Sequence, residues 1–141
     1  MGSIPQHVSI FSLGTHNIDT IRQFYRGWGW SESPISTPEF VAFDVGSAMI
    51  SFYDMEALAE EAHGDARPEG QWGGFTLAMN VSDQEELDRV YAAAVEAGAT
   101  PISEPTKQFW GGIAGYVSDP DGNRWELSTG GPKPAPVSES S

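Results

Sequence analysis

The chain of 141 residues contains no cysteine, so it can form no disulfide, no thiolate metal site and no cysteine nucleophile. Basic residues are scarce: seven lysines and arginines stand against twenty aspartates and glutamates, for a net charge of −13. A polyanion repels such a chain, which argues against nucleic-acid binding. The same charge argues against anionic membrane surfaces. We therefore expect a partner that is neither a nucleic acid nor a membrane.

Long apolar runs are also missing. None approaches the roughly 20 residues that a membrane-spanning helix needs. The first ten residues, MGSIPQHVSI, lack the basic region and the apolar core of a secretory signal. These absences predict a soluble, cytoplasmic protein. Hydrophobic residues make up 39% of the chain, which is enough for a folded domain despite the charge.

The first half of the chain predicts the order β-α-β-β-β. Asn17 is a favourable helix N-cap, and Gly29 is a suitable residue to end the helix. Between them, apolar side chains recur with helical spacing, at Ile18, Ile21, Tyr25 and Trp28. The other elements predicted here are strands at 7–13, 30–34, 39–45 and 48–53 and a short helix at 54–63.

The second half predicts the same order. Ser82 and Glu85 have the spacing of a capping box, and Gly98 suits the end of the helix that follows. The sequence DPDG at 119–122 predicts a tight turn. The apolar stripe of the helix comprises Leu87, Val90, Tyr91, Ala94 and Val95, and strands are predicted at 74–81, 100–103, 110–118 and 123–129.

The two halves match as an internal repeat. Tyr25 and Tyr91 are 66 residues apart, and the neighbouring apolar helix positions keep that offset. The organisation predicted is a first module at 5–63, a linker at 64–73, a second module at 74–130 and a disordered tail at 131–141, which is rich in proline and serine.

Two segments carry a family resemblance: FYRGWGW at 24–30 and GYVSDPDGNRWEL at 115–127. Over about residues 5–130 the chain resembles the vicinal oxygen chelate superfamily, which includes glyoxalase I, extradiol dioxygenases, fosfomycin-resistance enzymes and bleomycin-binding proteins. The resemblance implies an α+β fold of two βαβββ modules in tandem, which form cupped half-barrels around a cavity. It also implies a homodimer.

In members of this superfamily that bind a metal, four ligands come from the first and fourth strands of each module. The matching positions here are Ile10, Ile50, Thr76 and Glu126, or Ser51 in place of Ile50 if the fourth strand is shifted by one residue. Only Glu126 is a good ligand, and one carboxylate holds a transition metal poorly. We therefore expect no metal and no other cofactor. A site built from the histidines would need His7, His16 and His63 to converge.

Glu126 is the sharpest candidate for chemistry. Its strand alternates polar and apolar residues, so Glu126 points into the cavity if Trp125 and Leu127 pack under the helices. A carboxylate in an apolar cavity could act as a general acid or base. The alternative is a structural role, in which Glu126 only hydrogen-bonds to polar groups of the barrel.

The other predicted ligand-binding residues follow from strand alternation and from one aromatic segment. Trp110 precedes Gly111-Gly112 and could cover a cavity or stack on a ligand. Strand alternation places the remaining candidates on the inward faces, namely Ser12, Phe52, Thr76 and Ala78.

Two functions stay open at this point. The first is a metal-independent protein that binds and sequesters a small molecule, similar to the bleomycin-binding branch. The second is a lyase, isomerase or dioxygenase-like enzyme that uses Glu126, with or without a metal. We favour the first, because three of the four ligand positions lack good donors.

Overall fold

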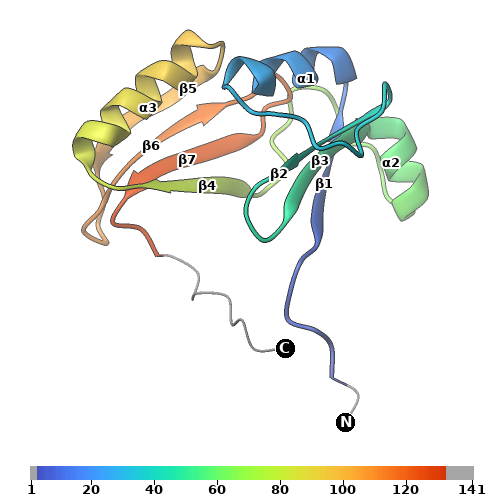
Figure 1. Cartoon of the computed structure of the whole chain (residues 1–141), viewed down its shortest axis with the longest axis horizontal. Coiled ribbons are helices and arrows are strands. Elements are labelled where there is room, and N and C mark those ends of the chain that lie inside the picture. The colour runs from blue at the N-terminus through green and yellow to red at the C-terminus, as the bar shows by residue number, and fades with distance from the viewer. Residues whose placement is uncertain (1–2, 133–141) are drawn as a thin grey trace. The chain divides into compact units, whose positions relative to one another are not determined.

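The computed structural model describes residues 3–132. It has the predicted mixed α+β fold, with three helices and two sheets of three and four strands (Figure 1). The chain divides into two compact units. The first unit comprises the residues up to 73 together with 119–122, and the second comprises 74–118 together with the residues from 123 on. Most of the predicted tail at 131–141 lies outside the described residues. Within residues 3–132, no helix is long and apolar enough to cross a membrane.

The first unit contains a three-stranded sheet in the order β1-β3-β2. β1 and β3 are parallel, and β2 and β3 are antiparallel. The elements in chain order are β1 (Ile10–Thr15), α1 (Ile18–Gly27), β2 (Phe40–Asp44), β3 (Met49–Asp54) and α2 (Met55–Ala62).

Helix α1 has the predicted cap and core face. The Asn17 side chain accepts a hydrogen bond from the Thr20 backbone N–H, and Gly29 has a positive φ of 90° just after the helix. Tyr25 is fully buried and its ring stacks on Phe52, with centroids 5.2 Å apart. This aromatic packing fixes α1 against the sheet.

The strand predicted at 30–34 does not form, so the first unit has one strand fewer than the second. An irregular segment lies along the free edge of β2 instead. Ser33 N–H donates to the Ala42 carbonyl at 2.7 Å, and the Ser36 hydroxyl accepts from Ala42 N–H at 3.0 Å. Pro34 and Pro38 have no backbone N–H to donate. The segment can therefore satisfy the β2 edge at single points but cannot continue a ladder.

The second unit has the complete βαβββ order, in a four-stranded sheet arranged β4-β7-β6-β5. α3 packs on one face of this sheet through its buried residues Leu87, Tyr91 and Ala94 (Figure 1). The elements are β4 (Thr76–Val81), α3 (Gln84–Glu96), β5 (Thr100–Lys107), β6 (Ile113–Ser118) and β7 (Arg124–Thr129).

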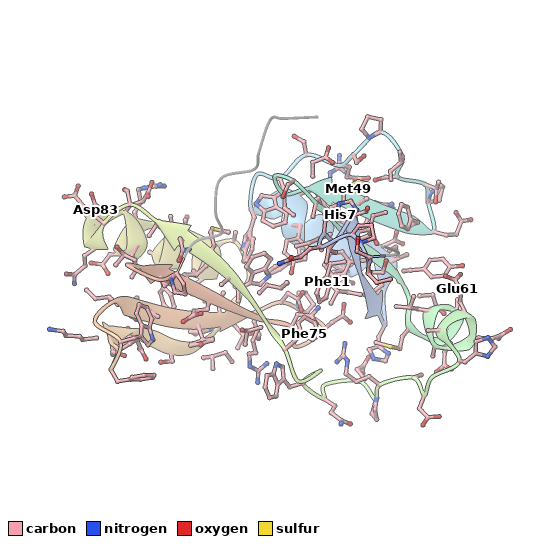
Figure 2. The ribbon with its side chains drawn as sticks, turned by 90° about the horizontal axis from the view of Figure 1, so that it is seen from below. His7, Phe11, Met49, Glu61, Phe75 and Asp83 are labelled. Atoms are coloured by element: carbon pink, nitrogen blue, oxygen red, sulfur yellow. The ribbon has the colours of Figure 1, made fainter. Side chains whose placement is uncertain are left out.

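The cap of α3 is shifted by one residue from the predicted capping box. Asp83, not Ser82, is the N-cap, and its carboxylate accepts from the Glu86 N–H at 2.8 Å (Figure 2 labels Asp83). Glu86, not Glu85, reaches back to accept from the N–H and hydroxyl of Ser82. These hydrogen bonds from Ser82 lower the pKa of Glu86. Aspartate competes well with serine for the cap position, which explains the shift.

The DPDG turn between β6 and β7 belongs to the first unit. Its two carboxylates are buried and hydrogen-bonded there. The Tyr25 hydroxyl donates to Asp119 at 2.6 Å. The Thr15 hydroxyl and the His16 N–H donate to the two oxygens of Asp121 at 2.6 and 3.0 Å. The turn thus holds the end of β1 and the buried face of α1.

We expect Tyr25→Phe to lower the free energy of unfolding by about 1–3 kcal/mol, because it leaves the buried Asp119 carboxylate without its tyrosine donor. Urea titration measures the change. Tyr53→Phe is the matched control, since the half-buried Tyr53 makes no side-chain hydrogen bond within the described part of the chain. Equal stability of the two variants would show that the Tyr25–Asp119 bond contributes nothing net.

Candidate functional site

The strand pairing shows which residues occupy equivalent positions in the two sheets. In the first unit Ser12 on β1 lies opposite Ser51 on β3. In the second unit Ala78 on β4 lies opposite Glu126 on β7. Ser51 is therefore the counterpart of Glu126. Ile50 lies one residue away, opposite Phe11, and its side chain is directed to the other face of the sheet.

Glu126 lies in the middle of the second sheet, on the side away from α3. The neighbouring Trp125 and Leu127 are buried, so alternation places Glu126 on the opposite face. We call this side the Glu126 face. Its strands contribute Thr76, Ala78 and Asn80 from β4, Arg124, Glu126 and Ser128 from β7, and Ala114, Tyr116 and Ser118 from β6.

Tyr116 is the direct neighbour of Glu126. The two residues are opposite each other on β6 and β7, while Ala78 flanks Glu126 on the other side. Burial raises the pKa of the Tyr116 phenol, and the negative charge of Glu126 and a hydrogen bond to it raise that pKa further. The phenol therefore stays protonated and can donate to the carboxylate. The pair presents carboxylate oxygens as acceptors beside a hydroxyl group.

One end of the Glu126 face is covered by the chain that follows β7. Ser128 donates to the Asn80 side-chain oxygen at 2.8 Å, and the Asn80 amide donates to the Pro132 carbonyl at 3.0 Å. A Cβ added at Gly131 would meet the Asn80 side-chain oxygen at 2.8 Å, so Gly131 lies closely against the Asn80 side chain. Ser128 is only 2% exposed as a result. The region around Glu126, Ala78 and Thr76 lies away from this covered end, and Thr76 and Ala78 are exposed there.

Trp110 lies at the turn between β5 and β6, close to this covered end. A Cβ added at Gly112 would come within 1.9 Å of the Trp110 ring, so the ring packs directly on Gly112. The adjacent Phe109 is fully exposed. Trp110 is therefore a packed side chain at the end of the sheet, and the freely exposed aromatic residue of this turn is Phe109.

The structure does not bring all the predicted residues to one face. Thr76, Ala78 and Glu126 share the Glu126 face, whereas Ser12 belongs to the first unit, where Ser51 donates to it at 3.2 Å. Phe52 does not lie on the face of the first sheet that carries Ser12 and Ser51. It is fully buried against Tyr25. The reason is the one-residue shift of β3, which turns Phe52 to the α1 side.

The residues present do not fit a transition-metal site. The positions that match the metal ligands are Ile10 and Ser51 on the first sheet and Thr76 and Glu126 on the second, so Glu126 supplies the single carboxylate among these four. Among residues 3–132, no group of three or more histidines, cysteines, aspartates or glutamates is close enough to hold an ion. A transition-metal ion such as Zn²⁺ needs three or four nitrogen, oxygen or sulfur donors from the protein.

The three histidines have separate places, all within the first unit. His7 is exposed, and its ring lies 3.5 Å from the Ser9 hydroxyl, just before β1 (Figure 2 labels His7). His16 connects β1 to α1, and its backbone N–H donates to the Asp121 carboxylate. His63 ends α2 in the left-handed conformation, with φ 60°.

Tyr116 and Asn80 of the Glu126 face were not among the predicted site residues. Tyr116 could have been found, because it and Glu126 are both five residues from Asp121, on either side of the turn. Equal counts from a hairpin turn place two residues opposite each other. Asn80 had no such signal, since its partner Pro132 is 52 residues away in the sequence.

The family follows from comparison with known proteins. A model of the Glyoxalase/Bleomycin resistance protein/Dioxygenase superfamily matches residues 5–127. The chain belongs to this superfamily. The resemblance predicted from the sequence is thereby confirmed. No curated protein matches the chain.

Solved structures of this superfamily share the fold. A glyoxalase-related enzyme from Fulvimarina pelagi is 26% identical, with 89% of this chain and 88% of that chain covered and a TM-score of 0.79. A superfamily enzyme from Burkholderia phytofirmans is 25% identical, with 86% and 96% covered and a TM-score of 0.70. Lactoylglutathione lyase from Agrobacterium tumefaciens is 23% identical, with 90% and 96% covered and a TM-score of 0.66. This last similarity shows the fold alone.

We expect Glu126→Gln to lower the pKa of Tyr116, because the substitution removes the negative charge beside the phenol. Tyrosinate absorbance at alkaline pH measures the shift. The control is the double variant with Tyr91→Phe and Glu126→Gln. It removes Tyr91, whose pKa is also raised, by burial and by Glu104. An unchanged titration in Glu126→Gln would contradict the Tyr116–Glu126 contact.

The same contact has a consequence for stability. The folded-state pKa of Tyr116 lies above the value of an exposed tyrosine, about 10. Its contribution to stability is therefore fully present below about pH 10 and is lost as the pH rises through the folded-state pKa. In Tyr116→Phe, the alkaline loss of stability should be smaller than in the unmodified protein.

Proposed function

We propose that this chain is a metal-independent protein that binds and sequesters a small molecule, in the manner of the bleomycin-resistance branch of its superfamily. The observation that carries the proposal is the composition of the Glu126 face. This face presents the Tyr116–Glu126 pair beside the small side chains of Ala78 and Thr76, with no second strong metal ligand at the matching strand positions. Such a surface can bind a guest but has no means to hold a transition metal.

The chemistry of the pair indicates the class of guest. A carboxylate accepts hydrogen bonds and attracts positive charge, and the adjacent phenol adds a flat apolar ring. Ala78 leaves space on the other side of Glu126. We therefore propose a ligand that has a cationic or hydrogen-bond-donating group next to an aromatic or other planar group.

A second candidate is an enzyme in which Glu126 acts as general acid or base. The observation that favours it is again the Tyr116–Glu126 contact, because a phenol and a carboxylate in contact can pass a proton between them. The reaction would be of the lyase, isomerase or dioxygenase-like type found in the superfamily. A fold shared with lactoylglutathione lyase is compatible with this candidate but is not specific to it.

The superfamily resemblance also leads us to propose a homodimer, and the composition leads us to propose a cytoplasmic protein. Sedimentation velocity measures the first. A molecular mass near twice that of one chain, 15.2 kDa, is the expected result. A concentration-independent monomer would contradict it.

We expect protein purified without chelator to contain no stoichiometric Zn, Ni, Mn or Fe, because the Glu126 face supplies a single carboxylate. Elemental analysis by mass spectrometry measures the content. A metal-to-protein ratio near one that falls in Glu126→Gln would contradict the metal-independent proposal and would favour the enzyme.

We expect bleomycin, a cationic glycopeptide with a flat aromatic portion, to raise the melting temperature in a saturable way, because a ligand of the native state stabilises it. Glu126→Gln should raise the dissociation constant of bleomycin about tenfold or more, since a hydrogen bond to a charged group is lost. Glu69→Gln is the charge-matched control. Glu69 is exposed, and in the sequence it belongs to the segment that connects α2 to β4.

The same protein is assayed for turnover of the hemithioacetal of methylglyoxal and glutathione. Turnover that disappears in Glu126→Gln, without saturable stabilisation by bleomycin, would favour the enzyme over the binding protein. Stabilisation that is equal in Glu126→Gln and in the unmodified protein would show that the Glu126 face is not the binding site.

A further inference from the structure

A separate cleft lies at the end of α1, where the chain turns away from the helix. It has a volume of about 390 Å³ and is lined by Arg26, Gly29, Trp30, Ser31 and Glu32. This volume falls within the range of about 300–1,000 Å³ that small-molecule sites occupy. All five residues belong to the first unit, and none lies on a strand of either sheet.

The turn that forms the cleft is rigidly held. Gly29 N–H donates to the Arg26 carbonyl at 2.9 Å, and Trp30 N–H donates to the Tyr25 carbonyl at 3.1 Å. The Trp30 ring stacks on Tyr25, with centroids 5.1 Å apart, and meets the edge of Phe43 at 5.6 Å. Beside Gly29 the space is open, since a Cβ built there would meet no atom within 4 Å. The cleft therefore has one firm aromatic wall and an unobstructed side.

Two guanidinium groups converge on a single carboxylate at this cleft. Glu32 pairs with Arg22 at 3.3 Å through one oxygen and with Arg26 at 3.6 Å through the other. The side chain of Arg22 is only 14% exposed, and it also donates to the carbonyls of Thr37 and Phe40. The cluster thus carries one positive charge in excess, on a chain whose net charge is −13.

Arg26 can still donate hydrogen bonds from the two terminal nitrogens of its guanidinium group. Its pair with Glu32 is made through Nε, and its side chain is 62% exposed. Within residues 3–132, no other acceptor reaches its guanidinium. The two terminal nitrogens can therefore bind a planar carboxylate with two parallel hydrogen bonds. A monoanion would neutralise the single excess charge, whereas a dianion would leave a negative charge on an already acidic protein.

We propose that this cleft is a second ligand site, which binds a small aromatic carboxylate. The carboxylate pairs with Arg26, and the ring lies against Trp30. The site is independent of the Glu126 face and of the function proposed for it.

Benzoate is the probe, and the amide signals of Gly29, Trp30 and Ser31 in ¹H–¹⁵N spectra of the full chain are the readout. We expect saturable shifts of these signals, with a dissociation constant on the order of 1 mM. Benzamide, which has the same ring without the charge, should give no saturation, and inorganic phosphate should bind more weakly than benzoate. Equal binding of benzamide or of phosphate would overturn the proposal.

Variants locate the site. Arg26→Gln should weaken benzoate binding by about 10-fold to 100-fold, which is the effect of losing a charge-assisted hydrogen-bonded pair. Arg89→Gln is the matched control, because Arg89 is 68% exposed and pairs with Glu86 at the same 3.6 Å, but does not line this cleft. The absence of saturable shifts, or equal affinity in the two variants, would overturn the proposal.

Discussion

The burial of two carboxylates in the DPDG turn is the constraint on which the first unit depends. Asp119 and Asp121 are 4% and 5% exposed, and a buried carboxylate is costly unless hydrogen bonds replace its water. Tyr25, Thr15 and the His16 N–H supply those bonds. The same Tyr25 stacks on Phe52 and on Trp30. One tyrosine therefore connects the turn, the sheet and the wall of the α1 cleft.

The two units differ in the number of strands and in the residue at the centre of the sheet. In the second unit all four strands form, and the central position of the sheet carries Glu126 between Tyr116 and Ala78. In the first unit the equivalent position is the fully buried Ser51, opposite Ala42 on β2. Only the second sheet therefore carries an ionisable residue at this position. This asymmetry is the physical basis for proposing that the second sheet binds a guest without a metal.

How far the sequence predicts the site depends on how local each interaction is. Glu126 could be predicted, because the DPDG turn and the alternation of its own strand place it. Phe52 was assigned to the wrong face, because the β1–β3 register depends on pairing between strands 39 residues apart, which no local pattern reports. Trp110 was predicted to cover a cavity or stack on a ligand. What the sequence did not show is that its ring packs on Gly112, which has no side chain.

The sequence by itself determined the helices, the cap of α1 and the DPDG turn, because these depend on contacts within about four residues. The cap of α3 was predicted one residue away from its position. The sequence also determined the superfamily, through the two motifs around Tyr25 and the DPDG turn. Only the tertiary structure decided which strand is missing, which residue faces Glu126 and how Arg26 comes to line a cleft. The physical reason is that hydrogen bonds and charge pairs between distant segments depend on register and burial, which are properties of the folded chain.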